Sequence, residues 1–319
     1  MRACLLSERE HALTVFASLR NRTLQYGSAQ SFDVSSSSLK DQFRELLGGV
    51  IDADSRPTDG SIHAARKTLK RARAALRLMR AGMDDADYRH ANRQLRDIAR
   101  PLTLVRDAVA LRDALEAVRK KCDKLPLQRY ADEVHRVLHD DHRLQRERLT
   151  AEMLRHSGEK LRAVASKINR TPAKISDAAT ARRGIKKTFR SGRKAFSKIR
   201  PHARVTEMHE WRKQVKYLAN EIDLAERLKL LKLKKARRCA ERLAEVLGVD
   251  HDLALLRLKL RALSQGDITG RRPERKRLEH RIEQKRRKLR RKTHRLGRRL
   301  YAAPAARFER SLKRRLQRS

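Results

Sequence analysis

The sequence has few of the residues that form turns, cross-links and aromatic cores. It contains 12 Gly and 7 Pro in 319 residues, fewer than a β-sandwich or barrel needs for its many turns. Aromatic residues make up 4% of the chain, so a core has to be built from Leu, Ala, Val and Ile. These scarcities exclude most all-β folds and favour helices.

Cysteines and long apolar runs are also scarce. The three cysteines (Cys4, Cys122 and Cys239) lie far apart, and no CxxC or Cys/His zinc spacing exists. We therefore expect reduced thiols of the kind found in cytosolic proteins. The apolar run in residues 1–9 is too short for a signal peptide, and no run approaches the ~20 residues of a transmembrane helix. The sequence predicts a cytoplasmic protein.

Positive charge is what the chain has in excess. Its 81 Lys and Arg residues outnumber 38 Asp and Glu, which gives a formal net charge of +43. A charge of this size repels itself and attracts polyanions. Nucleic acid, an anionic membrane surface and a phosphate polymer are therefore the favoured classes of partner.

The order of polar and apolar residues predicts three parts. They are an N-terminal extension with a short helix and a Ser-rich linker (1–38), a helical domain (39–300) and a basic C-terminal tail (301–319) that is loose after Pro304. The short helix is expected at residues 8–26. The helical domain divides into halves at about 39–165 and 180–300, and no alternating pattern of a β-strand occurs in it.

Turn residues predict where the helices of this domain end. The breaks fall at 54–60, near Gly82, and at 125–126, 157–158, 171–172, Pro201, Gly248 and 265–270. They imply about eight helices with short connections before residue 264. A further basic amphipathic helix is expected over 278–300, because Leu and Ile recur there at helical spacing among many Lys and Arg.

The most informative feature is a repeat at an offset of about 146 residues. Both copies read H-x-x-R-K-x-x-K, and the matching residues are His63, Arg66, Lys67 and Lys70 in the first and His209, Arg212, Lys213 and Lys216 in the second. The apolar residues beside them recur in phase, from Ile62 to Met79 and from Met208 to Ala225. The repeat predicts two related halves, each with a helix whose apolar stripe packs inward.

The cations of each copy lie on the helix face beside the apolar stripe. In the first copy Arg77 continues the row at i+14 from His63. Like charges at i,i+4 destabilise an isolated helix by about 0.2–0.5 kcal/mol per pair. An anion lying along the row would reverse this penalty. A solvated basic face is the alternative, but recurrence of the same residue types in the same phase argues against it.

A second repeated segment follows each of these helices. Residues 102–107 and 247–252 both begin with Leu and end with Asp after a basic or titratable residue. Asp107 and Asp252 are therefore candidates to orient a cationic side chain of the preceding helix. We expect that role to be structural.

The two H-x-x-R-x-x-x-K helices, each followed by an L-G-x-x-R-D-like segment, resemble the CHAD family, whose name stands for conserved histidine α-helical domain. The resemblance covers about residues 39–300. It implies an all-α fold in which two pseudo-symmetric antiparallel four-helix bundles form one domain around a basic central groove or pore. It also implies binding of inorganic polyphosphate there and association with polyphosphate granules.

By position, the resemblance assigns ten residues to polyphosphate contacts. They are His63, Arg66, Lys67, Lys70, Arg73, Arg77, His209, Arg212, Lys213 and Lys216. The chain departs from the family pattern at Ala219-Asn220, where Arg-Tyr is usual, at Thr103, where Gly is usual, and at His251, where Arg is usual. The second half is therefore expected to make fewer anion contacts, for which the basic C-terminal region would compensate.

The two repeat histidines predict a pH dependence. His63 and His209 stand among cations, which favours their neutral form, whereas a bound polyanion favours protonation. We therefore expect binding to take up protons and to tighten as the pH falls toward 6.

Nonspecific binding of DNA or RNA is the main alternative function, because phosphate contacts dominate such affinity. No zinc finger, RRM signature or P-loop is present, and scarce aromatics disfavour stacking of single-stranded bases. The basic C-terminal region is the expected site of such binding.

Catalysis and metal binding have weaker support. No acidic cluster for Mg²⁺ accompanies the histidines, and the Glu-x-Glu-x-Lys pattern of triphosphate tunnel hydrolases is absent, so we expect neither enzymatic activity nor a cofactor. His135, His139 and His142 share one helical face, as zinc ligands do. Neighbouring arginines disfavour a cation there, and a solvated or packed face is the expected interpretation.

Overall fold

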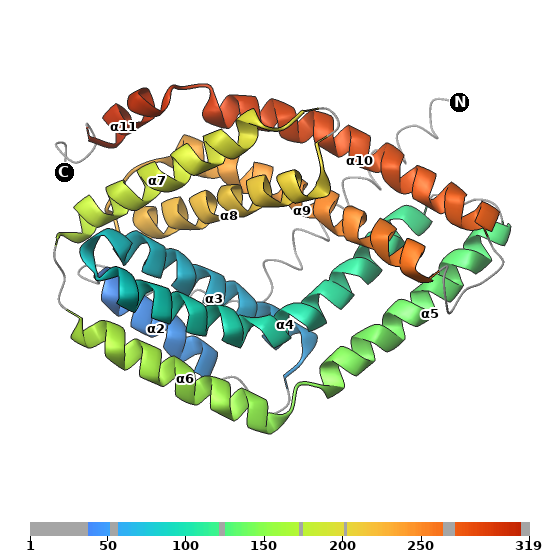
Figure 1. Ribbon diagram of the computed structural model, residues 1–319, viewed down its shortest axis with the longest axis horizontal. Helices are drawn as coiled ribbons and strands as arrows, with labels where there is room; N and C mark the ends of the chain where they lie inside the picture. Colours follow the sequence, from blue (N-terminus) through green and yellow to red (C-terminus); the bar gives the residue numbers. More distant parts are fainter. Residues whose placement is uncertain are drawn as a thin grey trace, which may run out of the picture. The chain divides into compact units, whose positions relative to one another are not determined.

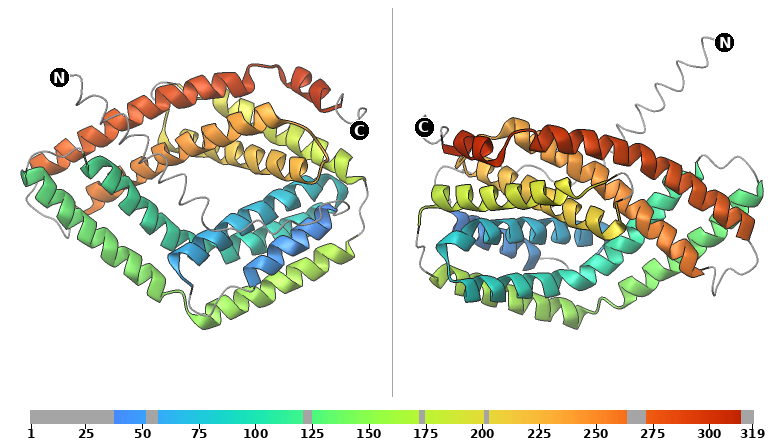
Figure 2. Two further views of the ribbon diagram at one scale, coloured as in Figure 1. Left: turned by 180° about the vertical axis from the view of Figure 1, so that it is seen from behind. Right: turned by 45° about the horizontal axis from the view of Figure 1, so that its top comes forward.

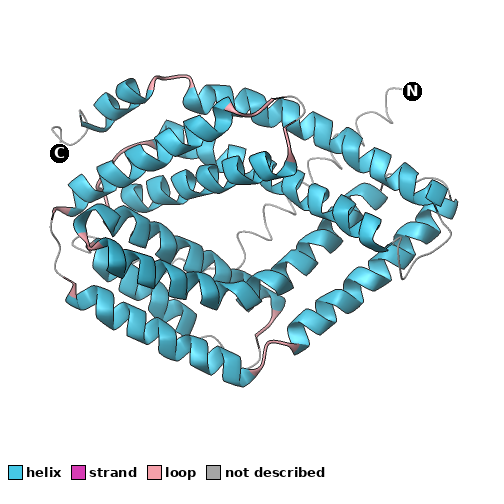
Figure 3. Cartoon of the chain, in the orientation of Figure 1, coloured by secondary structure: helices cyan, strands magenta, loops and turns pink. Residues whose placement is uncertain are grey.

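The computed structural model describes residues 38–51, 57–120, 125–171, 175–200, 203–263 and 272–313. Every regular element in these ranges is a helix (Figure 3), which confirms the all-α prediction. The helix expected at residues 8–26 lies outside them. No helix in the described ranges is long and apolar enough to cross a membrane.

Ten α-helices and one 3₁₀ turn make up the described part of the chain (Figure 1). In chain order they are α2 (Leu39–Ile51), α3 (Asp59–Met79), η1 (Arg80–Gly82), α4 (Asp85–Arg119), α5 (Leu125–Glu147), α6 (Ala151–Arg170), α7 (Asp177–Ser197), α8 (Val205–Arg227), α9 (Lys234–Leu263), α10 (Arg272–Tyr301) and α11 (Ala305–Lys313).

Side-chain caps fix where several of these helices begin. Thr58, Thr150 and Ser176 each accept a hydrogen bond from the backbone N–H three residues later, at the starts of α3, α6 and α7. These bonds satisfy N–H groups that have no partner within the helix. At α8, Glu207 instead accepts from the backbone N–H of Arg204.

Two predicted breaks are wrong. Residues 157–158 lie inside α6, and Gly248 lies inside α9. A glycine costs a helix about 1 kcal/mol relative to Ala. The buried apolar residues on either side, such as Leu161 in α6 and Leu247 and Leu253 in α9, outweigh that cost. The break expected at 125–126 is instead the first turn of α5, where Pro126 is tolerated.

The chain after Pro304 is not loose as predicted, because Ala305–Lys313 form α11. Phe308 stacks on Phe189 of α7, with ring centroids 3.9 Å apart, and Leu312 is buried one turn further on. Glu309 pairs with Lys186 and Arg190 of α7. The apolar pair Phe308 and Leu312, at i and i+4, and the acid Glu309 thus dock this helix on α7.

The second half repeats the contacts of the first. In the first half α3 packs against α2 and α4, α4 against α5, and α2 against α6. In the second half α8 packs against α7 and α9, α9 against α10, and α7 against α11. The halves meet through α3 with α7 and α8, α4 with α9, and α5 with α10; Figure 2 shows these neighbours from two further sides. The two basic helices, α3 and α8, are therefore in direct contact.

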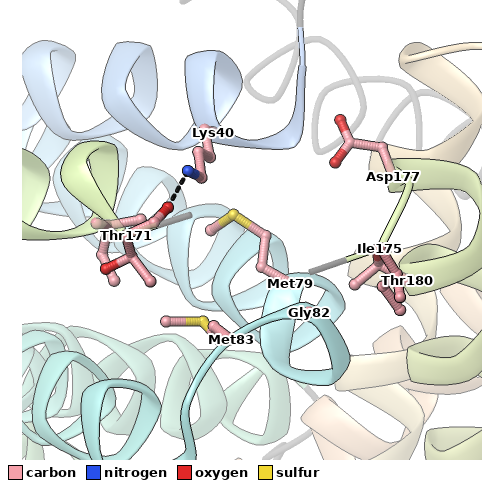
Figure 4. A pocket seen from close by; sticks show the side chains of 9 residues that line it. Lys40, Met79, Gly82, Met83, Thr171, Ile175, Asp177 and Thr180 are labelled. Atoms are coloured by element: carbon pink, nitrogen blue, oxygen red, sulfur yellow. Dashed lines mark hydrogen bonds between the residues drawn. The ribbon is translucent and has the colours of Figure 1, made fainter. Parts of the chain in front are cut away.

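Hydrogen bonds also join the start of the second half to α2. Asp177 accepts from the backbone N–H of Leu39 (Oδ2–N 2.7 Å), and the Lys40 ammonium donates to the carbonyl of Thr171 (Figure 4). A cavity of about 30 Å³ lies among them, beside Met79 and other apolar residues. It has room for about two waters, so these contacts join helices and do not form a ligand site.

A buried ion pair attaches α10 to α9. The Arg286 Nε lies 3.1 Å from Asp250 Oδ1, and both side chains are under 5% exposed (4% and 3%). Glu283 adds a second contact to Arg286. Leu278 and Ile282 of the same helix are fully buried in an apolar cluster, so α10 is part of the core even though most of its residues are charged.

Asp250→Ala is expected to lower the free energy of unfolding by about 3 kcal/mol, because it leaves a buried guanidinium with one acid fewer. Urea unfolding of the single variant and of Asp250→Ala with Arg286→Met measures this. The double variant is expected to recover most of the loss. A cost below about 1 kcal/mol, or no recovery in the double variant, would show that the pair does not hold α10 in place.

Candidate anion-binding site

The apolar stripes of α3 and α8 face inward as the repeat predicts. The residues from Ile62 to Met79 and from Met208 to Ala225 are buried at every predicted position except Ala65, which is partly buried. The basic rows therefore flank the α3–α8 contact.

Six of the ten predicted residues lie together with four residues of the second repeated segments. We call this group the central cluster; it comprises His63, Arg66, Lys70, Arg106, Asp107, His209, Arg212, Lys216, His251 and Asp252. The cations of α3 and α8 act on one another within it. Arg66 of α3 and Arg212 of α8 both lower the pKa values of Lys70 and Lys216. The two halves thus contribute cations to one place.

Two aspartates partly balance these cations. Arg66 lies 3.7 Å from Asp107, and its side chain is only 11% exposed. Asp252 and Asp107 both act on Arg212, whose pKa is nevertheless lowered, chiefly by burial. Asp107 thus lies beside a cation of the preceding helix, as expected, and Asp252 acts on the second arginine.

Two buried arginine N–H groups of the central cluster have no hydrogen-bond acceptor among the described residues. They are Nε of Arg212 and one terminal nitrogen of Arg106. Buried polar groups in folded proteins are nearly always hydrogen-bonded. The Arg106 nitrogen lies 3.8 Å from Asp113 Oδ2, and both nitrogens are shielded from solvent, so a ligand does not reach them directly in this arrangement.

The two lysines are the most perturbed cations of the central cluster. Burial, followed by the charges of Arg212 and Lys70, lowers the pKa of Lys216 to about 7. Burial, followed by Arg66 and Arg212, lowers the pKa of Lys70 to about 8. Lys70 is nevertheless exposed to solvent and Lys216 is half-buried. Both side chains therefore reach solvent in part, while their ammonium groups are poorly solvated and close to other cations.

The histidines behave in the predicted direction. Burial and then Arg106 lower the pKa of His63, while burial and then Arg212 lower that of His209. His251 lies over His209 with ring centroids 5.1 Å apart, and burial with Arg212 lowers its pKa to about 4. Burial is the leading cause of all three lowered pKa values. The sequence pattern does not reveal this burial, because it depends on how α4 and α9 pack.

Four predicted residues are not members of the central cluster, although Lys67 and Lys213 act on its histidines, His63 and His209. Lys67 has Arg71, Arg227 and Asp223 as its main charged neighbours. Arg73, Arg77 and Lys213 line a separate cavity between α3, α4, α7 and α8. The structure thus places six of the ten assigned residues in the central cluster and three at the separate cavity, and Lys67 lines neither.

Arg106 and His251 belong to the central cluster but were not among the predicted contacts. Each directly precedes the aspartate of its repeated segment, and this shared position is the sequence feature that could have identified both.

The histidine face of α5 forms no cluster. His142 is buried between Asp59 (Nε2–Oδ1 3.0 Å) and Arg112 (3.3 Å), whereas His139 is exposed. No group of His, Cys, Asp or Glu residues able to hold a metal ion occurs in the described ranges.

Two solved structures share this fold. The CHAD domain of the plant Ricinus communis aligns with a TM-score of 0.60 at 18% identity, covering 87% of this chain and 96% of its own. PptA from Streptomyces chartreusis aligns with a TM-score of 0.58 at 14% identity, covering 84% and 98%. At these identities the likeness shows the fold alone. None of the curated proteins compared with the chain matches it.

The model of the CHAD domain matches residues 38–261. This range contains both basic rows, both repeated segments and every residue of the central cluster. Since the match also extends over most of the sequence, the chain belongs to the CHAD family.

Proposed function

We propose that the central cluster binds inorganic polyphosphate without catalysis. The observation that carries the proposal is the meeting of Arg66 and Lys70 of α3 with Arg212 and Lys216 of α8. Packing these cations together without an anion is unfavourable, as the lowered pKa values of the two lysines indicate. A bound polyanion would turn this repulsion into attraction.

The kinds of donor present suit a phosphate chain. Arginine forks bind two phosphate oxygens at once, and lysines supply mobile point charges. Opposite charges about 4 Å apart attract by roughly 4 kcal/mol at an effective dielectric near 20, before desolvation. A polymer with about one charge per unit can meet several such donors in turn, which a single headgroup cannot.

We further propose that the halves form two pseudo-symmetric antiparallel four-helix bundles around a basic groove that holds the chain of phosphates. The repeated contacts of α2–α6 and α7–α11 support this arrangement. The behaviour of Lys70 supports the groove, because a side chain that is exposed yet poorly solvated is typical of a concave surface. We place the protein in the cytoplasm, at polyphosphate granules.

Duplex nucleic acid is the second candidate partner, and the outer face of α10 favours it. Six exposed cations in its second half have no ion-pair partner in the part of the chain that the structure describes; they are Arg287, Lys288, Arg291, Arg295, Arg298 and Arg299. No acid occurs between Glu283 and Glu309. Such a face would bind a phosphate backbone of any sequence.

A salt-titrated competition between long-chain polyphosphate and duplex DNA separates the two candidates. The intact chain is compared with Arg287→Gln/Arg291→Gln/Arg295→Gln, because removing α10 would also remove core residues such as Leu278. We expect polyphosphate to displace DNA and to bind the variant almost as tightly as the intact chain. Equal competition by DNA, with both affinities lost in the variant, would make α10 the functional surface instead.

A further inference from the structure

A second basic cavity lies beside the central cluster, between α3, α4, α7 and α8. It has a volume of about 500 Å³, within the range of roughly 300–1,000 Å³ typical of small-molecule sites. We call it the side pocket. Six cations line it and no acid does; they are Arg73, Arg77, Arg80, Arg183, Lys187 and Lys213.

Several of these cations are held in place by neighbouring groups. Arg73 donates to Asn92 (Nε–Oδ1 3.2 Å), and Arg77 donates to the carbonyl of Arg73 (2.9 Å). The Arg77 guanidinium lies 3.4 Å from the ring centre of Tyr217, and that of Arg80 lies 4.5 Å from the ring centre of Tyr88. Cations fixed in this way lose little freedom on binding a ligand, so they are preorganised donors.

Nearby acids only partly neutralise the side pocket. Asp85 pairs with Arg80 (2.9 Å), and Glu210 pairs with Lys213. Glu221 lies 3.6 Å from Arg77 but is fully buried, and burial raises its pKa to about 7. Arg183 and Lys187 are exposed on α7, and neither has an ion-pair partner among the described residues; their charges are therefore available to a ligand.

The arginines that α3 and η1 contribute to the side pocket are not repeated in the second half. At the repeat offset Arg73, Arg77 and Arg80 correspond to Ala219, Asp223 and Glu226. Asp223 and Glu226 instead pair with Arg227 and Arg237. The equivalent face of the second half is thus neutralised internally. Both faces thus have cations, and they differ in that Asp223 and Glu226 neutralise those of the second half, whereas no acid lines the side pocket.

We propose that the side pocket binds a compact oligophosphate, either free or as the end of a longer chain. The inference rests on the proposed function in that both sites take condensed phosphate. Three features favour a compact ligand. The cations converge from three segments on one cavity, and several are arginines able to bind phosphate oxygens bidentately. Tyrosine, amide and hydroxyl groups also line the cavity; they are Tyr88, Tyr217, Asn92, Gln214, Thr188 and Ser191. A linear polymer that only crosses the protein needs no such cavity.

Calorimetric titration of the full chain with tripolyphosphate tests the proposal. Arg183→Gln/Lys187→Gln removes two exposed side chains that make no ion pair with any residue the structure describes, so the fold should be retained, as circular dichroism will check. We expect this variant to bind tripolyphosphate about 10- to 100-fold more weakly. The matched control is Lys234→Gln/Lys235→Gln, which removes the same charge from exposed positions on α9 outside the side pocket. Its affinity should stay within about twofold of the intact chain.

The outcomes separate the side pocket from the central cluster. If Lys70→Gln/Lys216→Gln abolishes tripolyphosphate binding and Arg183→Gln/Lys187→Gln does not, the side pocket is not a site, while the proposed function stands. An equal loss in the α9 control would also overturn the inference, because only net charge would matter. If long-chain polyphosphate fails to bind the intact chain but tripolyphosphate binds the side pocket, the proposed function fails alone.

Long polyphosphate whose terminal phosphates carry a bulky amide distinguishes the two sources of the ligand. Weaker binding of this polymer to the intact chain, but not to Arg183→Gln/Lys187→Gln, would support the end of a chain as the occupant. Unchanged binding of the capped polymer, with tripolyphosphate still dependent on Arg183 and Lys187, would support a free oligophosphate.

Discussion

The double substitution Lys70→Gln/Lys216→Gln is expected to weaken binding of long-chain polyphosphate and to stabilise the ligand-free fold at the same time. Each lysine supplies a charge-assisted contact worth about 1.5–3 kcal/mol, so the affinity should fall by roughly 100-fold or more. Burial, followed by neighbouring cations such as Arg66 and Arg212, lowers the pKa values of both lysines, which makes their charges a cost without ligand. Their removal should raise the free energy of unfolding by on the order of 1 kcal/mol, since solvent screens much of the repulsion.

Urea unfolding and calorimetric titration of the same preparations measure the two changes. Lys234→Gln/Lys235→Gln again serves as the control, because it removes two exposed cations from outside the central cluster. It should change neither quantity appreciably. A double variant that loses affinity and stability together would indicate that the lysines support the fold, and unchanged affinity would show that phosphate binds elsewhere.

Polyphosphate affinity is expected to fall steeply as the pH rises from 7 to 9. The free protein holds Lys216 at a pKa of about 7 and Lys70 at about 8, and a bound polyanion raises both. The affinity that each lysine adds is therefore fully present below its pKa in the free protein and is lost as the pH rises toward its pKa in the complex. Above pH 8 both lysines take up a proton on binding. Each proton changes the affinity by at most about tenfold per pH unit, so the affinity should fall by at most about 100-fold per unit.

The stability of the ligand-free protein should change in the opposite direction. A lysine with a lowered pKa in the folded state binds fewer protons there than in the unfolded state, so stability rises with pH between about 7 and 10. His63 and His209, whose pKa values are also lowered, extend the proton uptake on binding below pH 7. Titrations in buffers of different ionisation enthalpy count the protons, and binding without proton uptake at pH 8 would contradict the assignment of the two lysines.

The basic rows were predictable from sequence because they depend on one local period. An H-x-x-R-K-x-x-K pattern beside an apolar stripe fixes which face His63, Arg66 and Lys70 occupy, and the repeat at His209 doubles the evidence. The same local reasoning failed at Gly248, where burial of neighbouring leucines outweighs the cost of glycine in a helix.

Contacts between distant segments were not predictable in this way. Arg183 and Lys187 stand on α7, and only the packing of α7 on α3 and α8 brings them to Arg77. The docking of Phe308 on Phe189 likewise depends on where α7 lies. A single sequence does not show which distant segments pack together. The side pocket and the position of α11 could therefore be found only from the structure.

The central claim is that cations of both halves form one binding site. Titrating long-chain polyphosphate into Lys70→Gln and into Lys216→Gln separately tests it most directly, because each substitution alters one half only. Both are made in the Arg183→Gln/Lys187→Gln background, so that the side pocket does not contribute. If the halves share one site, each substitution should weaken all high-affinity binding by about tenfold and leave no class of sites with the original affinity. A remaining class of sites with the original affinity and half the capacity, in either variant, would show instead that the two halves bind polyphosphate independently.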